Sequence, residues 1–352
     1  MRPSIYIGLG GTGIRILAAI KKQYEDVYGK GNIPPIVNFL AIDFNLADIN
    51  NPELPTSLEE DALLIPYVGD PRKHLEARVE QGDYKWMFPG NTCSIFGRLA
   101  SSPDQLRTTG RFYTEYLLPY IQTALQQRVQ QVQQIAFAPE FDLYILTSLC
   151  GGTGAGSFIN IAELARRLYG KRCNIIGYGV LHNIFQTRDP LGTKTQKLPI
   201  NTYSTIKDLD YLMSATPSKP IKFTINGQER VLSSPPFDLF YVVDNKTDNG
   251  QTVTNIQELC TYVGLHIYTR SQIPLPGINP QEMVVLHTWE AVIPYCIEAF
   301  DEQVVEEYER VIEAYLSGGS TFNPHVDKEL FDQMCQEGFS LKPRSASEEP
   351  EQ

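Results

Sequence analysis

Two glycine-rich segments have the composition of phosphate-binding loops. Residues 10–13 read Gly-Gly-Thr-Gly, and residues 150–157 read Cys-Gly-Gly-Thr-Gly-Ala-Gly-Ser. Glycine has no Cβ and tolerates positive φ, so backbone N–H groups in such loops can approach a phosphate closely. Neither segment is a Walker A loop, because no Gly-Lys-Ser/Thr sequence follows at the required spacing. We therefore expect phosphate binding by backbone donors, with the Thr153 hydroxyl either on a phosphate oxygen or capping a helix.

Each glycine segment lies between an apolar run and an amphipathic run, which is the order strand, loop, helix. Residues 5–9 precede the first segment and residues 141–149 precede the second, and both runs are typical of buried strands. The helices that follow are expected over 14–28 and 158–169. Each helix would then point the positive end of its dipole at its own loop.

The remaining elements predict a doubly wound α/β fold with a mostly parallel sheet and helices on both faces. A 3-2-1-4-5-6 strand order would place both glycine loops beside one crevice at the carboxyl ends of the strands. Pro119 predicts a kink in its helix, or a helix start near Leu118. Further strands are expected at 35–43, 62–68, 173–181 and 237–244, a hairpin at 221–232, helices at 111–134, 201–213 and 252–268, and irregular chain at 44–61, 69–109 and 182–199.

The composition excludes some classes of partner. The chain has 352 residues and a formal net charge of −11, which argues against nucleic acid as the main partner. Loops and helix dipoles can still bind a nucleotide inside an acidic protein. No apolar run approaches the roughly 20 residues that a membrane span needs. The six cysteines form no CxxC pair and the five histidines have no metal spacing, so we expect reduced thiols in the cytoplasm and no metal site built from these residues.

Cys150 adjoins an expected helix N-terminus. That position lowers the pKa of a thiol. A nucleophilic cysteine also needs a base partner, and the sequence indicates none. We therefore expect no catalysis by Cys150.

The first glycine segment also permits a different interpretation. Residues 8–13 satisfy G-x-G-x-x-G, and Asp43 ends the second expected strand, which is the outline of a Rossmann dinucleotide site. The chain would then be an NAD(P)-dependent oxidoreductase. A dinucleotide fold does not need a second glycine loop after its fourth strand, so two loops favour a nucleotide with several phosphates.

The second glycine segment, placed after the fourth expected strand, resembles the signature loop of the tubulin/FtsZ superfamily. The family loop is close to GGGTGSG, and residues 150–156 read CGGTGAG. The resemblance covers about residues 3–270, and the variant loops are more similar to divergent bacterial tubulin-like proteins than to FtsZ. Other family motifs are matched in the same order by residues 8–13 (first glycine loop), 41–43 (second-strand end), 101–111 (third phosphate-side loop), 199–201 (ribose-side loop) and 242–245 (start of the base-binding segment).

The resemblance implies a GTP-binding protein that assembles head to tail, with GTP or GDP and Mg2+ between the two loops. Asn245 would read guanine, since an amide can both donate and accept on the base edge. Leu198 stands where the family carries a glutamate before the ribose-side loop. The residues that the resemblance assigns to the nucleotide are Gly10, Gly11, Thr12, Gly13, Asp43, Gly110, Arg111, Gly151, Gly152, Thr153, Gly154, Gly156, Ser157, Asn201 and Asn245.

Hydrolysis is less well supported than binding. In this family a loop of pattern Asn-x-Asp-x-x-Asp brings acids to the γ-phosphate of the neighbouring subunit. Residues 277–282 here read Gly-Ile-Asn-Pro-Gln-Glu, so Glu282 is the remaining candidate catalytic acid. A nucleotide-binding scaffold that does not hydrolyse GTP, with a protein as its partner, is therefore an alternative.

The same resemblance predicts the domain organisation. Residues 1–270 would form the nucleotide-binding domain, including a long central helix at 252–268. Residues 271–339 would form a reduced C-terminal α+β region, with a strand at 282–286 and an acidic helix at 299–316. Residues 340–352, rich in Ser, Glu and Pro, are expected to be a disordered tail.

Overall fold

The computed structural model describes residues 2–63, 71–80, 107–137, 139–186, 197–225, 228–246, 251–272 and 286–288. Several predictions fall on other residues and lie outside the described part of the chain. They are most of the strand predicted at 62–68, most of the strand predicted at 282–286, the acidic helix at 299–316, the tail at 340–352 and Glu282. Most of the expected C-terminal region, 271–339, also lies outside it.

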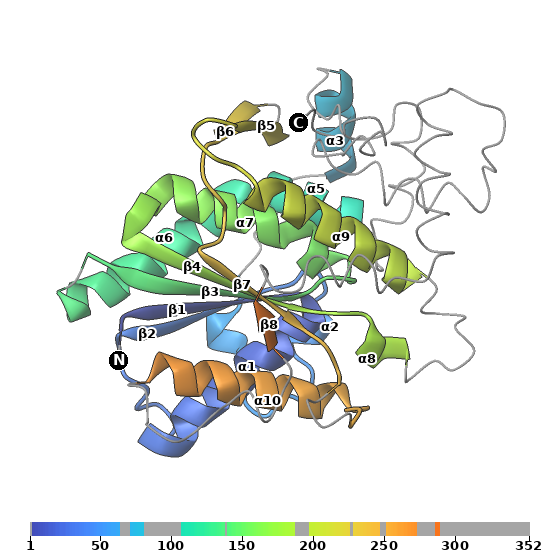
Figure 1. Cartoon of the computed structure of the whole chain (residues 1–352). Helices are drawn as coiled ribbons and strands as arrows, with labels where there is room; N and C mark the ends of the chain where they lie inside the picture. Colours follow the sequence, from blue (N-terminus) through green and yellow to red (C-terminus); the bar gives the residue numbers. More distant parts are fainter. Residues whose placement is uncertain are drawn as a thin grey trace, which may run out of the picture.

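A six-stranded sheet forms the centre of the fold (Figure 1). Its order is β2-β1-β3-β4-β7-β8, with the first five strands parallel and β8 antiparallel to β7. Every residue of β1 and β3 is buried, as expected for parallel strands covered on both faces. The strands are β1 (Ser4–Leu9), β2 (Val37–Ile42), β3 (Phe141–Ser148), β4 (Cys173–Val180), β7 (Leu239–Val243) and β8 (Leu286–Thr288).

This order confirms the predicted topology for the strands that the structure describes. The expected third strand contributes Ala62 and Leu63 to the described residues. Ala62 forms a parallel bridge with Ala41, and the Leu63 N–H donates to the Ala41 carbonyl oxygen at 2.8 Å. This segment therefore lies beside β2, at the edge where the 3-2-1-4-5-6 order places it.

Helices cover both faces of the sheet (Figure 1). On one face, α1 (Gly10–Tyr28) and α10 (Ile256–Ser271) share a hydrophobic core with Tyr6 of β1. On the other, α6 (Leu118–Ala136), α7 (Thr153–Tyr169) and α9 (Lys197–Met213) share a second core with Ile5 and Ile7. The alternation along β1 follows from side chains that point to opposite faces of a strand. The smaller elements are α2 (Leu46–Ile49), α3 (Pro71–Glu80), α5 (Arg107–Tyr116), α8 (Asn183–Gln186), the hairpin β5 (Ile221–Ile225) and β6 (Gln228–Leu232), and 3-10 turns at Glu59–Asp61 and Gly170–Arg172.

Helix α3 corrects the prediction of irregular chain over 69–109. Its first residue is Pro71, and proline suits the first position of a helix because the missing N–H needs no partner there. Residues 71–80 are otherwise rich in Leu, Glu, Ala and Arg, which are strong helix formers. Leu75 is buried and gives the helix an apolar contact.

The prediction about Pro119 is confirmed. Helix α5 ends at Tyr116 and α6 begins at Leu118, so Pro119 lies in the first turn of α6. The missing N–H of proline is tolerated in a first turn. Helix α10 begins at Ile256, later than predicted, because the Asn255 side chain accepts a hydrogen bond from the Gln257 N–H at 2.9 Å and caps the helix there. None of the described helices is long and apolar enough to cross a membrane.

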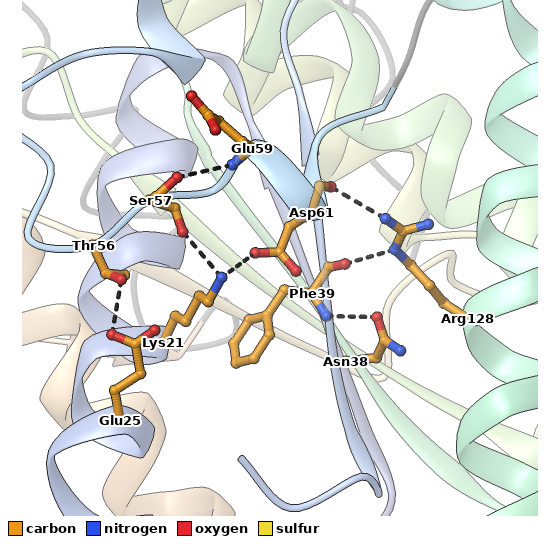
Figure 2. A network of polar contacts seen from close by, with 9 residues as sticks. All are labelled: Lys21, Glu25, Asn38, Phe39, Thr56, Ser57, Glu59, Asp61 and Arg128. Carbon is orange, nitrogen blue, oxygen red and sulfur yellow. Dashed lines mark hydrogen bonds and ion pairs between the residues drawn. The ribbon is translucent and has the colours of Figure 1, made fainter. Parts of the chain in front are cut away.

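A network of polar contacts joins α1, α6 and residues 57–61 near the β2 side of the sheet (Figure 2). Lys21 of α1 donates to the Asp61 carboxylate at 2.6 Å and to the Ser57 carbonyl oxygen at 3.0 Å. Arg128 of α6 donates to the carbonyl oxygens of Phe39 at 2.6 Å and Asp61 at 3.3 Å. Since α1 and α6 lie on opposite faces of the sheet, residues 57–61 are held from both sides.

His266 is a buried histidine in the packing of α10 against the sheet. The residue is 4% exposed and lies against the rings of Tyr178 and Tyr241, each 6.0 Å away between centroids. Neither ring nitrogen has a hydrogen-bond partner within the described part of the chain. Burial lowers the pKa of His266 to about 4, and the charge of Arg270 acts in the same direction.

We expect the His266→Phe variant to lose less stability in acid than the wild type. The unfolded chain takes up a proton at this histidine near pH 6.5, whereas the folded chain does so near pH 4, so its stabilising contribution is lost as the pH falls between these values. The full difference is about 3 kcal/mol, at 1.36 kcal/mol per pKa unit. Urea unfolding of both proteins from pH 7 to pH 4.5 should show most of this difference, and parallel pH profiles would refute it.

Candidate functional site

A cavity of about 310 Å³ lies at the carboxyl ends of the central strands. It occupies the point between β1 and β3 where the strand order reverses, which is the usual ligand position in such sheets. The lining includes residues 10–12 and 150–154 from the two glycine segments, Asp43 and Asp48 after β2, Ser148 at the end of β3, Phe185 after β4, Arg15 and Leu198.

The two glycine segments form adjoining walls of this cavity. Gly10 has φ +68, in the left-handed region that favours glycine. A Cβ on Gly10 would lie 3.1 Å from the Gly154 nitrogen and 3.4 Å from the Thr153 Cβ. The helices α1 and α7 begin at Gly10 and Thr153, earlier than the predicted starts at 14 and 158, so parts of both glycine segments are helical and the first turns of both helices meet here.

Asp43 and Thr153 are joined across the cavity wall. The Thr153 hydroxyl donates to the Asp43 carboxylate at 2.9 Å, and the Asn45 N–H donates to the same oxygen at 3.1 Å. The pKa of Asp43 is raised to about 6, chiefly by burial and also by the charge of Asp48, although these two donors act to lower it. In this structure the Thr153 hydroxyl therefore binds Asp43 and makes no helix cap.

Sequence reasoning missed Asp48, Arg15, Ser148 and Phe185. A Cβ on Gly11 would lie 2.9 Å from an Asp48 carboxylate oxygen and 3.5 Å from the Arg15 guanidinium, so these two side chains flank the first glycine segment. The sequence could have indicated Arg15 as a cavity residue, because it follows Gly11 by four positions and such residues lie on one face of a helix. Nothing in the local pattern around Asp48 points to the cavity.

Several predicted site residues are not part of the cavity lining, and three of them are glycines. A Cβ would lie 2.2 Å from the Leu146 carbonyl oxygen at Gly13, 2.2 Å from the Gly152 carbonyl oxygen at Gly110, and 2.3 Å from the Arg107 carbonyl oxygen at Gly156. These glycines let α1 approach β3 and let α5 approach the start of α7. They position the loops through close backbone packing.

Ser157 and Arg111 lie between α5 and α7. The Ser157 hydroxyl donates to the Thr153 carbonyl oxygen at 2.5 Å, and a 2.7 Å hydrogen bond joins it to the Thr114 hydroxyl. The Arg111 guanidinium donates to Glu115 at 2.9 Å within its own helix, and both side chains are buried. In this structure both predicted residues contact protein groups behind the cavity, and phosphate contact by them stays a prediction.

The two predicted asparagines also contact backbone groups. The Asn201 amide donates to the Cys150 carbonyl oxygen at 3.0 Å and ties α9 to the second glycine segment. The Asn245 amide donates to the Val253 carbonyl oxygen at 3.1 Å, and the Val253 N–H donates to the Asn245 carbonyl oxygen at 2.7 Å. Asn245 thus closes the turn before α10, and guanine recognition by it stays a prediction. Leu198, which stands where the family carries a glutamate, lines the cavity with an apolar side chain.

The expectation of a lowered pKa for Cys150 is wrong. Burial raises the pKa of this thiol to about 12, because the loss of water destabilises the thiolate more than a helix N-terminus favours it. The thiol is therefore protonated at neutral pH. The described residues contain no group of three or more His, Cys, Asp or Glu that could hold a metal ion.

Comparison with known proteins identifies the family. The family described as "Tubulin like" matches residues 5–275, whereas a search of curated proteins found no match. One similar solved structure is CetZ from Methanosaeta thermophila strain DSM 6194, with 16% identity and a TM-score of 0.43, over 80% of this chain and 57% of that chain. A second is a GTPγS-bound protofilament of CetZ2 from Haloferax volcanii, with 15% identity and a TM-score of 0.43, over 79% of this chain and 61% of that chain. A third is a GTPγS-form protofilament of TubZ from Bacillus thuringiensis serovar israelensis, with 14% identity and a TM-score of 0.39, over 81% of this chain and 62% of that chain.

The family match and the solved structures differ in how much they cover. The chain spans between 57% and 62% of the length of these three structures. The family match, in contrast, extends over well more than half of this chain and includes both glycine segments. This chain therefore belongs to the tubulin-like family.

Proposed function

We propose that this protein binds a guanine nucleotide, GTP or GDP, with the phosphates between the two glycine segments. The observation that carries the proposal is that residues 10–12 and 150–154 line one cavity at the starts of α1 and α7. Each segment supplies backbone N–H groups and the positive end of a helix dipole, which together favour anionic oxygens. The volume of about 310 Å³ falls within the range of small-molecule sites.

The two carboxylates in the lining fit a Mg2+ ion that accompanies the phosphates. Mg2+ is usually held by one or two carboxylates, waters and substrate phosphates, and Asp43 and Asp48 are the acidic residues that line the described cavity. The ion would neutralise phosphate charge that these carboxylates would otherwise repel. Because burial raises the pKa of Asp43 to about 6, its ionised form predominates above that pH.

Hydrolysis would require an acid that activates water against the γ-phosphate. In this proposal the acid comes from a neighbouring subunit in a head-to-tail assembly, and Glu282 is its candidate. Such a contact is heterologous and open-ended, so GTP turnover would depend on assembly. Family membership supports this part of the proposal.

Titration with GTP, GDP, ATP and NADH tests the binding proposal. We expect GTP and GDP to bind at micromolar concentrations and ATP at least about tenfold more weakly, a difference of about 1.4 kcal/mol. Absence of GTP binding at high micromolar concentration would refute the proposal. Preferential NADH binding would support the dinucleotide alternative, although that alternative gives no role to the second glycine segment.

A GTPase assay over a range of protein concentrations tests the assembly proposal. If a neighbouring subunit supplies the acid, the rate per subunit rises with protein concentration and is lost in Glu282→Gln. A rate that stays at background while GTP still binds would identify the protein as a nucleotide-binding scaffold.

A further inference from the structure

Arg15 brings a positive charge to the cavity, and it is the only basic residue among the described residues that line it. Long side chains in a helix point back toward its N-terminus. Accordingly, Arg15 Nη1 donates to the Gly11 carbonyl oxygen at 3.3 Å. The guanidinium therefore lies over the first turn of α1, which is the turn that lines the cavity.

The guanidinium of Arg15 has weak protein partners in the described part of the chain. Its Nη2 lies 3.8 Å from a carboxylate oxygen of Glu53, whose side chain is 75% exposed, whereas that of Arg15 is 17% exposed. Ion pairs with an exposed partner contribute little to stability. The Nε atom is buried and has no hydrogen-bond partner among the described residues, although buried donors in proteins normally have one.

Residues 48–61 follow α1 from the cavity to the sheet edge. At the far end Lys21 holds Ser57 and Asp61 (Figure 2), and Thr56 donates to Glu25 at 2.8 Å. At the cavity end the link between Glu53 and α1 is the long ion pair with Arg15. Because the far end is anchored separately, Arg15 can exchange Glu53 for another acceptor while the segment stays on α1.

We infer that Arg15 is a phosphate-binding residue, whose guanidinium exchanges Glu53 for an anionic oxygen of the bound nucleotide. The inference rests on the proposed function. A guanidinium presents donors in a fork that matches phosphate oxygens. Asp43 and Asp48 add negative charge to the same cavity, so Arg15 offsets the repulsion that a polyphosphate would meet there.

The test compares GTP, GDP and guanosine in calorimetric titrations of the wild type and Arg15→Gln. We expect the variant to bind GTP and GDP about 10- to 100-fold more weakly, in line with the loss of a hydrogen bond between charged groups, and guanosine as well as the wild type does. Arg15→Lys should retain part of the affinity, since it keeps the charge and loses the fork. Glu53→Gln should raise the affinity for GTP about two- to fivefold, because the competing carboxylate is removed.

The other outcomes of these titrations would refute either the phosphate assignment of Arg15 or the proposed function. An equal loss for guanosine would place Arg15 on the base or ribose and refute the phosphate assignment. Unchanged GTP affinity in Arg15→Gln and in Glu53→Gln would refute the inference, whereas a wild type that binds no guanine nucleotide would refute the proposed function. Lys22→Gln is the matched control, because Lys22 lies on the same helix, pairs with Asp26 and is not among the cavity-lining residues; its GTP affinity should equal that of the wild type.

Discussion

Replacement of Gly151 by alanine is expected to lower the affinity for GTP about 100-fold and to leave the fold nearly unchanged. Gly151 lines the cavity, and a Cβ there would lie 2.9 Å from the Ser148 hydroxyl oxygen, which a side-chain rotation can relieve. The methyl group would keep a phosphate from the backbone N–H groups of the loop. Loss of hydrogen bonds to a charged group costs about 1.5–3 kcal/mol each, and a 100-fold change corresponds to about 2.7 kcal/mol.

Calorimetric titration with GTP and urea unfolding of the same samples separate binding from stability. Gly31→Ala is the matched control, since Gly31 has φ +80 and no atom within 4 Å of an added Cβ. It should lose about 1 kcal/mol of stability through backbone strain and bind GTP normally. Wild-type affinity in Gly151→Ala would show that the phosphates do not lie against this loop.

Asp208→Asn is expected to have the largest effect on stability, a loss of about 3–5 kcal/mol in the free energy of unfolding. Asp208 of α9 accepts from the Arg107 guanidinium of α5 at 2.7 Å, and the two side chains are 5% and 2% exposed. Removing one partner of a buried ion pair is strongly destabilising, because the remaining charge loses the attraction of that partner in a medium of low dielectric constant. Urea unfolding of the whole chain measures the loss.

The exposed pair between Lys222 and Glu229 in the β5–β6 hairpin provides the control. These groups lie 3.1 Å apart with both side chains about two-thirds exposed, at 67% and 64%, so Lys222→Gln should change the free energy of unfolding by less than about 1 kcal/mol. The double replacement Arg107→Met with Asp208→Leu should recover much of the loss, because it removes both buried charges. Equal stabilities of Asp208→Asn and Lys222→Gln would contradict the assignment of a buried pair.

Much of the fold was predictable because its signals are local in the chain. The apolar runs at 5–9, 141–149 and 173–181 are long enough and rich enough in β-branched residues to indicate buried parallel strands. Pro119 located the start of α6 because proline lacks the N–H that a helix interior requires. Helix α3 was missed because glycine, proline and serine dominate the chain around it, while its stabilising contact through Leu75 comes from tertiary packing.

The sequence by itself determined that two glycine segments follow two strands, since their composition and order do not depend on packing. Only the tertiary structure decided what the lack of a Cβ allows at each glycine. At Gly151 it leaves the cavity open, at Gly10 it lets the first turns of α1 and α7 approach each other, and at Gly13 it makes room for the Leu146 carbonyl oxygen. The raised pKa of Asp43 and the position of Arg15 also depend on how helices and loops pack. Neighbours that are distant in the chain set both burial and the available partners, so no local pattern encodes them.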